Sequence, residues 1–229
     1  MIYSYGLGID WIIIIITFVI TFGAQGYINS TYRKTRKIKS KSNMSGAEVA
    51  RKILDSNNLF DVRVVETRGF LSDHYDPKNK VVRLSSDVYS NSSIASISVA
   101  AHEVGHAIQD KNGYFFLRLR SSIIPFVNIA SSLGYVAMLI GLFMSSMHFF
   151  RIGILLEMVI LFFQLVTLPV EFNASHRALV QLEELSIVDS LEKRRCFSML
   201  RAAAFTYVAA VLTAILEIVR LIMISKNDE

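Results

Sequence analysis

The sequence has one cysteine, Cys196, among 229 residues. A single cysteine excludes an intrachain disulfide and a metal site built from several thiolates. We expect Cys196 to be an ordinary surface or helix residue, because nothing around it suggests an activated thiol. The sequence also shows no internal repeat and no low-complexity segment.

Lysine and arginine are absent before the first long apolar run. A secretory signal peptide begins with a positively charged region, which is missing here. The run, at about residues 6–27, is longer than a typical signal core, and the basic residues follow it at 33–41. We therefore expect an uncleaved membrane anchor at this position.

Charged residues make up 19% of the sequence and hydrophobic residues 52%, with a mean hydropathy of +0.43. This composition is too apolar for an ordinary soluble domain. Several apolar runs approach the roughly 20 residues that a helix needs to cross the hydrocarbon core. They lie at residues 6–27, 123–144, 152–170 and 202–224. The sequence thus predicts a mostly α-helical integral membrane protein, a single unit over residues 1–229, with four transmembrane helices.

The basic residues are clustered, although the net charge is only +5. They concentrate in residues 29–120 and 171–201, which four spans would bring to the same side of the membrane. The N-terminus, the 145–151 loop and the C-terminus would lie on the other side. Because basic loops stay in the cytoplasm, the two basic regions are predicted to be cytoplasmic. The clustering indicates contact with the lipid bilayer and not with nucleic acid.

The segment between the first two spans has its own pattern. Ser45 and Glu48 have the spacing of a capping box, which predicts a helix over about 46–57. Short β-branched stretches and turn residues predict the other elements. These are strands at 62–66 and 81–84, a turn at 76–79 and a helix at about 93–109. We expect the cytoplasmic segments to form a small α+β domain continuous with the membrane helices.

The helix expected at 93–109 contains His102, Glu103 and His106. Histidines four residues apart on a helix project from one face and can bind one metal ion. Zinc at such a site lowers the pKa of a bound water, whose proton a neighbouring carboxylate accepts. The motif predicts two histidine ligands and a general base, and Gly105 would let another backbone approach closely. The alternative is a pair of surface histidines on an amphipathic helix.

A zinc site of this kind needs a third protein ligand. Glu171 follows the third span, where the chain returns to the side that carries His102 and His106. His148 lies in the opposite loop and is poorly placed. Arg177 is expected to pair with a carboxylate near the site. Other nearby candidates for the third ligand are His74, His176, Glu183 and Glu184.

Three motifs occur in order, at residues 72–77, 101–109 and 168–175. With them the chain closely resembles, over nearly its whole length, the YugP-like neutral zinc metallopeptidases of bacterial membranes. It is more distantly similar to the HtpX and CAAX prenyl proteases. The resemblance implies one zinc ion per chain, with Glu103 as the general base. The zinc ligands that it implies are His102, His106 and Glu171.

The distant relatives carry further implications. A strand before their catalytic helix, here at roughly 70–86, lies along the cleft and pairs with the substrate backbone. His74 is then expected to polarise the substrate carbonyl or hold the oxyanion, the alternative being a turn histidine bonded to its neighbours. Those relatives have aspartate where this chain has Ser175. The partner of the zinc-bound histidine is therefore expected to be Asn173 or Ser175.

Together these expectations predict a membrane-embedded zinc endopeptidase with a zincin-like cytoplasmic part. Its partners would be a peptide or membrane-protein substrate and the lipid bilayer, and its role membrane-protein processing or quality control. A catalytically inactive zinc-binding scaffold or chaperone is the alternative. Glu103 argues against it, because zinc binding alone needs no base. Zinc transport is disfavoured, since transporters carry their metal ligands within the spans.

Overall fold

The computed structural model describes residues 3–69, 72–144 and 146–227. Residues 70–71, part of the segment expected along the cleft, and Ser145, in the loop expected after the second span, lie outside the described residues. The chain divides into two compact units, which we call the helical unit and the α/β unit. The helical unit comprises Met1–Gln25, Leu119–Leu168 and Thr206–Glu229, and the α/β unit comprises Gly26–Arg118 and Pro169–Phe205.

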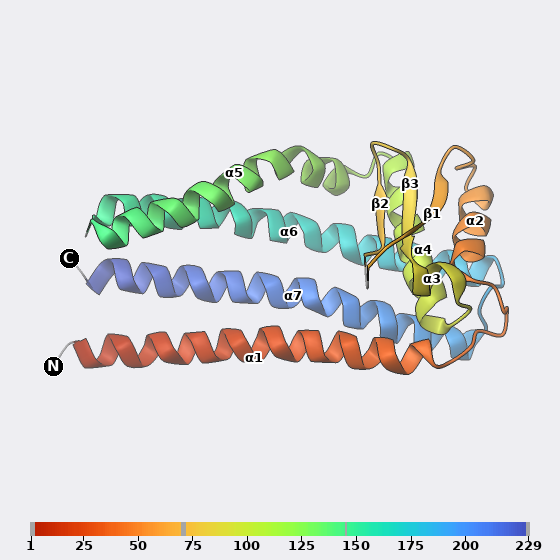
Figure 1. The fold of residues 1–229 in the computed structure, drawn as a ribbon, viewed down its shortest axis with the longest axis horizontal. Coiled ribbons are helices and arrows are strands. Elements are labelled where there is room, and N and C mark those ends of the chain that lie inside the picture. Colours follow the sequence, from red (N-terminus) through yellow and green to blue (C-terminus); the bar gives the residue numbers. More distant parts are fainter. Residues whose placement is uncertain (1–2, 70–71, 145, 228–229) are drawn as a thin grey trace. The chain divides into compact units, whose positions relative to one another are not determined.

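Long helices form the helical unit and continue into the α/β unit (Figure 1). Each is long and apolar enough to cross a membrane, and each contains one of the expected spans, except that the second of these helices ends one residue before the expected 123–144 span does. They are α1 (Tyr3–Arg36), α5 (Phe115–Phe143), α6 (Met147–Glu184) and α7 (Ser190–Asn227).

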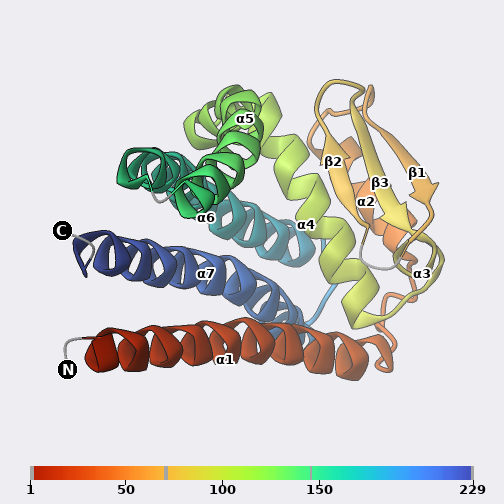
Figure 2. The ribbon, with the colours of Figure 1, turned by 60° about the vertical axis from the view of Figure 1, so that its left-hand side comes forward.

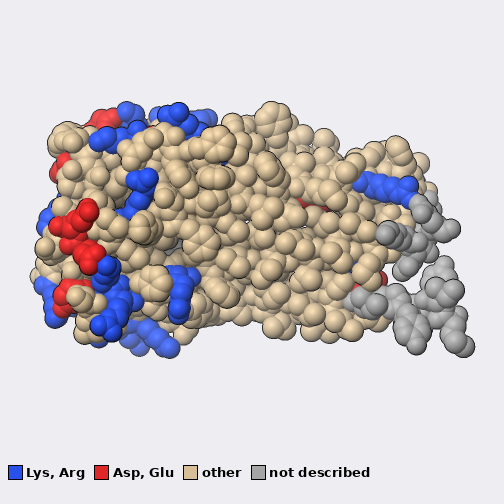
Figure 3. Space-filling model, turned by 180° about the vertical axis from the view of Figure 1, so that it is seen from behind, with Lys and Arg blue, Asp and Glu red and all other residues tan. Residues whose placement is uncertain are grey.

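Large hydrophobic side chains cover the outside of the helical unit. Trp11 is 63% exposed, Phe18 61% and Leu155 62%. Most charged side chains on the face in Figure 3 are gathered at one end, a few lie near the other end, and the broad area between them is almost free of charge. A surface of this kind is stable in hydrocarbon but not in water. The exposed apolar helices therefore support a membrane location.

Helix α6 corrects one expectation. The third span was predicted to end at residue 170, with Glu171 after it, but α6 runs unbroken from Met147 to Glu184 with Pro169 inside it. No glycine interrupts residues 154–184, so the glycine that commonly ends a helix is missing after the span. Proline is tolerated within such helices because neighbouring groups satisfy the freed backbone carbonyl. Glu171 consequently lies in the middle of a long helix.

The α/β unit contains a three-stranded sheet in the order β1-β3-β2. Strand β1 (Arg63–Thr67) pairs in parallel with β3 (Val81–Ser85), and β2 (His74–Asp76) pairs antiparallel with β3. Strands β1 and β3 lie where strands were predicted, at 62–66 and 81–84. The predicted turn at 76–79 joins β2 to β3, and the Asp76 carboxylate accepts hydrogen bonds from the backbone N–H groups of Lys78 and Asn79 at 3.1 and 3.2 Å.

Two helices pack against this sheet and form a common core with it (Figure 2). Helix α2 (Gly46–Ser56) begins with the predicted capping box of Ser45 and Glu48, and α4 (Ile94–Lys111) is the predicted motif helix. The short α3 (Ser86–Ser90) was not predicted. Buried core residues include Ile53, Leu84, Ile97, Leu182 and Cys196, all 0% exposed. Cys196 is therefore a buried helix residue and not a surface one.

Candidate metal centre

The α/β unit brings His102, His106 and Glu171 together. The two histidines lie one turn apart on α4, with ring centroids 4.8 Å apart, and Glu171 comes from α6. Glu171 Oε2 lies 3.2 Å from His102 Nε2 and 3.6 Å from His106 Nε2. One potential ligand atom of each residue lies within 4.8 Å of the other two. The three side chains that the motif and the topology singled out thus converge on one point.

Close packing of α4 on α6 makes this convergence possible. A Cβ atom added at Gly105 would lie 2.6 Å from the backbone oxygen of Ala174 and 3.2 Å from its Cα. Real Cβ atoms do not approach backbone so closely, so only glycine fits at this crossing. Gly105 stands between the two histidines, and Ala174 follows Glu171 by three residues. The predicted close approach of a second backbone is therefore present, and it sets the spacing of the site.

The donor set fits a zinc ion. Two imidazole nitrogens and one carboxylate oxygen are a usual set of three protein ligands in catalytic zinc sites, which leave a fourth position open. Glu171 is 2% exposed and His106 is 8% exposed, whereas His102 is partly buried. A buried carboxylate that contacts two imidazoles at its oxygen is suited to a cation between them.

Glu103 lies on the same helix and is 8% exposed. Among the residues that the structure describes, its carboxylate has no hydrogen-bond or ion-pair partner. Burial raises the pKa of Glu103, while the neighbouring imidazoles of His102 and His106 oppose that rise. A carboxyl group with a raised pKa and no competing partner is well suited to accept and return a proton.

Hydrogen bonds hold the outer nitrogens of both histidines. Ser175 Oγ lies 3.2 Å from His102 Nδ1, and Gln109 Oε1 lies 3.0 Å from His106 Nδ1. Ser175 was one of the two expected partners, and Asn173, the other, contacts Gln109 instead of a histidine. Sequence reasoning missed Gln109. Its signal was a polar residue three positions after His106, on the same helical face.

The other candidate ligands have different neighbours. Glu183 forms an ion pair with Lys193 at 2.5 Å, and Glu184 accepts a hydrogen bond from Gln181 at 2.9 Å. His176 is exposed. Within the described ranges, the convergent group includes none of these three. Arg177 also differs from expectation, because its Nε donates to the neutral side chain of Asn173 at 2.7 Å and not to a carboxylate.

His74 lies on the edge strand β2 and is exposed. Its Nδ1 is 2.8 Å from the backbone carbonyl oxygen of Ser72. A carbonyl only accepts, so Nδ1 carries the proton, and the Nε2 of neutral His74 can only accept. His74 would donate a hydrogen bond to a substrate oxygen only as the imidazolium. Its catalytic role stays a prediction.

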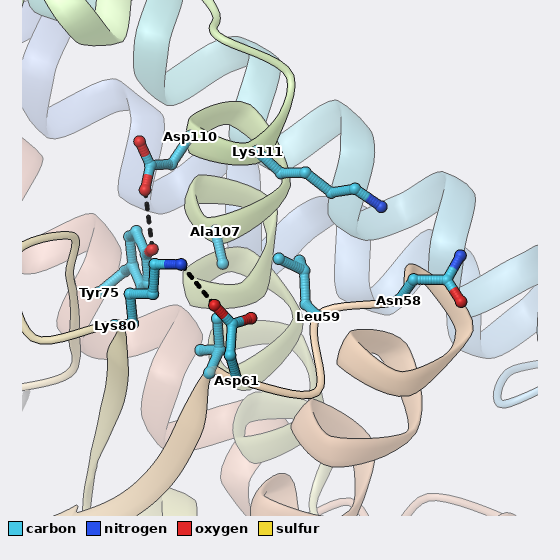
Figure 4. Close-up of a pocket in the computed structure, with 9 residues that line it drawn as sticks. Asn58, Leu59, Asp61, Tyr75, Lys80, Ala107, Asp110 and Lys111 are labelled. Carbon is cyan, nitrogen blue, oxygen red and sulfur yellow. Dashed lines mark hydrogen bonds and ion pairs between the residues drawn. The ribbon is translucent and has the colours of Figure 1, made fainter.

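A cavity of about 290 Å³ lies between the sheet and α4 (Figure 4). Four of the residues that line it form two pairs. Tyr75 on β2 donates a hydrogen bond to Asp110 on α4 at 2.9 Å, and an ion pair joins Lys80 to Asp61. Asp110 stands one helical turn beyond His106. A polar cavity therefore borders both the edge strand and the helix that carries the candidate site.

Comparison with known proteins identifies the family of the chain. Residues 10–226 match the protein family described as "Putative neutral zinc metallopeptidase". The chain belongs to this family. A relative, the "Putative membrane protease YugP" of Bacillus subtilis (strain 168), is 46% identical over 208 residues, which is 91% of this chain and 92% of the relative. No solved structure matches the chain. Family membership implies zinc, the metal that the donor set of His102, His106 and Glu171 fits.

Proposed function

We propose that this member of the zinc metallopeptidase family is a membrane-embedded endopeptidase of the gluzincin type, with the motif His102-Glu103-x-x-His106 at its centre. The observation that carries the proposal is the convergence of His102, His106 and Glu171 beside the buried carboxylate of Glu103, which has no hydrogen-bond or ion-pair partner among the described residues. A scaffold that only bound zinc would not need that fourth group.

In this proposal His102, His106 and Glu171 hold one zinc ion per chain. When bound, the ion supplies Lewis-acid activation of a water molecule and of the substrate carbonyl. Glu103 takes a proton from the water as its oxygen bonds to the carbonyl carbon. Glu103 then returns the proton to the leaving nitrogen, and the C–N bond breaks. One water is consumed, and a carboxylic acid and an amine are formed.

The edge strand β2 offers a place for the substrate backbone. Among the described strands β2 pairs with β3 alone, so its other edge can receive an extended peptide. The cavity beside Tyr75 and Asp110 can take a substrate side chain. We retain His74, on the same strand, as a residue that assists the carbonyl oxygen when it is protonated. The substrate would then be an extended, flexible segment of a peptide or membrane protein.

The proposed orientation follows from the basic residues. Residues 29–120 and 171–201 carry most of the lysine and arginine and would face the cytoplasm in a multi-pass cell-membrane protein. The zincin-like part, with the metal site, would then act on the cytoplasmic side. This orientation is consistent with membrane-protein processing or quality control.

The decisive experiment measures metal content and peptide cleavage in the purified full chain, in Glu103→Gln and in a control, Glu66→Gln. Glu66 is an exposed carboxylate on β1, away from the convergent group. One zinc per chain in all three proteins, with cleavage lost by about 10²- to 10⁴-fold only in Glu103→Gln, is the expected result. Zinc bound without cleavage of any substrate by the wild type would favour a scaffold. A wild-type chain without zinc would overturn the proposal.

A further inference from the structure

Gln109 is a fully buried amide beside the candidate metal site, with 0% exposure. The oxygen of a side-chain amide only accepts hydrogen bonds, and its nitrogen only donates them. Whichever end faces His106 therefore determines which ring nitrogen of that histidine carries the proton. Only the unprotonated nitrogen has a lone pair for a metal ion.

Two acceptors fix the orientation of this amide. Gln109 Nε2 lies 2.8 Å from the backbone oxygen of Val170 and 3.0 Å from Asn173 Oδ1. Because a backbone carbonyl cannot donate, the nitrogen of Gln109 must face it. The reversed amide would set its oxygen against the oxygens of Val170 and Asn173, with no proton between them.

Arg177 fixes the orientation of the Asn173 amide, whose oxygen is the second of these acceptors. Its Nε donates to Asn173 Oδ1 at 2.7 Å. A guanidinium has no acceptor, so the atom of Asn173 that faces it must be the oxygen. The same oxygen receives the N–H of Gln109. Arg177 and Asn173 both line an open cavity of about 340 Å³, so this end of the hydrogen-bond chain lies at the surface of the α/β unit.

Because its nitrogen donates to Val170 and Asn173, Gln109 presents its oxygen to His106 Nδ1 at 3.0 Å. Nδ1 must then carry the proton, and Nε2, which lies 3.6 Å from Glu171 Oε2, keeps its lone pair. We propose that Gln109, held by Val170 and by the Asn173–Arg177 pair, is a positioning residue that presets His106 in its metal-binding tautomer. This inference rests on the metal site proposed above.

The two histidines differ in this respect. His102 Nδ1 lies 3.2 Å from the hydroxyl of Ser175, and a hydroxyl can either donate or accept. Ser175 therefore does not dictate the tautomer of His102. The structure makes His106 the preset ligand and leaves His102 to adjust when the ion binds.

The test measures zinc affinity of the full chain in detergent, by competition with a chromophoric chelator. The variants are Gln109→Leu and a matched control, Gln181→Leu. Gln181 also bonds an asparagine within the α/β unit, Asn57, but contacts neither histidine. We expect Gln109→Leu to bind zinc about 10- to 100-fold more weakly, as is usual for loss of a ligand's hydrogen-bond partner, and Gln181→Leu to bind it normally. The cobalt(II) absorption spectrum should change only in Gln109→Leu.

A second pair of variants keeps the test decisive if Gln109→Leu does not fold. Asn173→Asp retains an oxygen for Gln109 and Arg177 and should bind zinc like the wild type, whereas Asn173→Leu should bind it more weakly. Wild-type affinity and a wild-type cobalt spectrum in Asn173→Leu, and in Gln109→Leu where that variant folds, would overturn the positioning role alone. A wild-type chain that binds no zinc would instead overturn the proposed function.

Discussion

The two units of the chain differ in how they place many of their large hydrophobic side chains. In the α/β unit Ile53, Leu84 and Ile97 are 0% exposed and belong to one core. In the helical unit Trp11 and Phe18 are more than 60% exposed. Exposed apolar surface on that scale is costly in water, but hydrocarbon solvates it as well as a protein core does. The energetic effect of exposing an apolar side chain therefore depends on the solvent. The α/β unit has the surface expected in water, and the helical unit has the surface expected in hydrocarbon.

Carboxylates in the two units also differ, in the partners that they contact. Glu171 in the α/β unit is buried against two imidazoles, whereas Glu217 in the helical unit pairs with Arg220 at 2.8 Å. Helix α6 carries a carboxylate in each unit, Glu157 and Glu171. If the metal chemistry belongs to the α/β unit alone, the same substitution at these two positions should have very different results.

The largest expected effect comes from this pair of glutamates. Glu171→Gln removes the anionic ligand and should weaken zinc binding by more than about 100-fold, since even loss of a ligand's hydrogen-bond partner costs 10- to 100-fold. Glu157→Gln should leave zinc affinity unchanged. Metal analysis after dialysis against a weak chelator distinguishes the two. Equal zinc content in both variants would remove Glu171 as a ligand.

A charged residue introduced on the exposed surface of each unit tests whether that surface contacts hydrocarbon or water. Phe18 is 61% exposed on α1, and Phe60 is 69% exposed in the α/β unit. Phe18→Asp should impair membrane insertion by about 3 kcal/mol, the cost of aspartate at the centre of a span. Phe60→Asp, on a surface that we expect to face water, should change stability by less than about 0.5 kcal/mol. Insertion assays and thermal unfolding measure the two effects, and similar tolerance at both positions would contradict the assignment of solvents.

Two glycines test how tightly each unit is packed. Gly105 meets the backbone of Ala174, whereas a Cβ at Gly23 in α1 would meet nothing within 4 Å. Gly105→Ala should destabilise the α/β unit by about 1–3 kcal/mol, as overpacking does, and should also separate the metal ligands. Gly23→Ala should be neutral or slightly stabilising, because alanine favours helix. Denaturation midpoints and zinc affinity of the two variants provide the comparison. A stable, zinc-binding Gly105→Ala variant would mean that the two helices lie farther apart.

Local patterns were sufficient to predict much of this fold. The spacing of Ser45 and Glu48 predicted where α2 begins, and the apolar runs predicted helices that the structure contains. The membership in the zinc metallopeptidase family, expected from three motifs, is confirmed. Each of these signals lies within a short stretch of sequence. In such a stretch, the spacing of polar and apolar residues is enough to indicate the local structure.

Features that depend on distant partners were not predictable in the same way. Strand β2 has three residues and exists because β3 pairs with it, so no local period reveals it. The tautomer of His106 depends on Val170 and Asn173, which are more than 60 residues from Gln109 along the chain. The motif predicted which residues gather at the site, but their hydrogen-bond partners became visible only in the packed helices. The catalytic roles themselves stay predictions for the experiments above.

The smallest effect is expected at His74, on the edge strand. Since its Nδ1–H is engaged by the Ser72 carbonyl, His74 can donate to a substrate oxygen only when protonated. His74→Ala should therefore lower kcat by about tenfold at neutral pH, less than the loss of a permanent oxyanion donor. The control His148→Ala, in the helical unit, should leave kcat unchanged. A kcat of His74→Ala equal to that of the wild type would reduce His74 to a residue that shapes the start of β2.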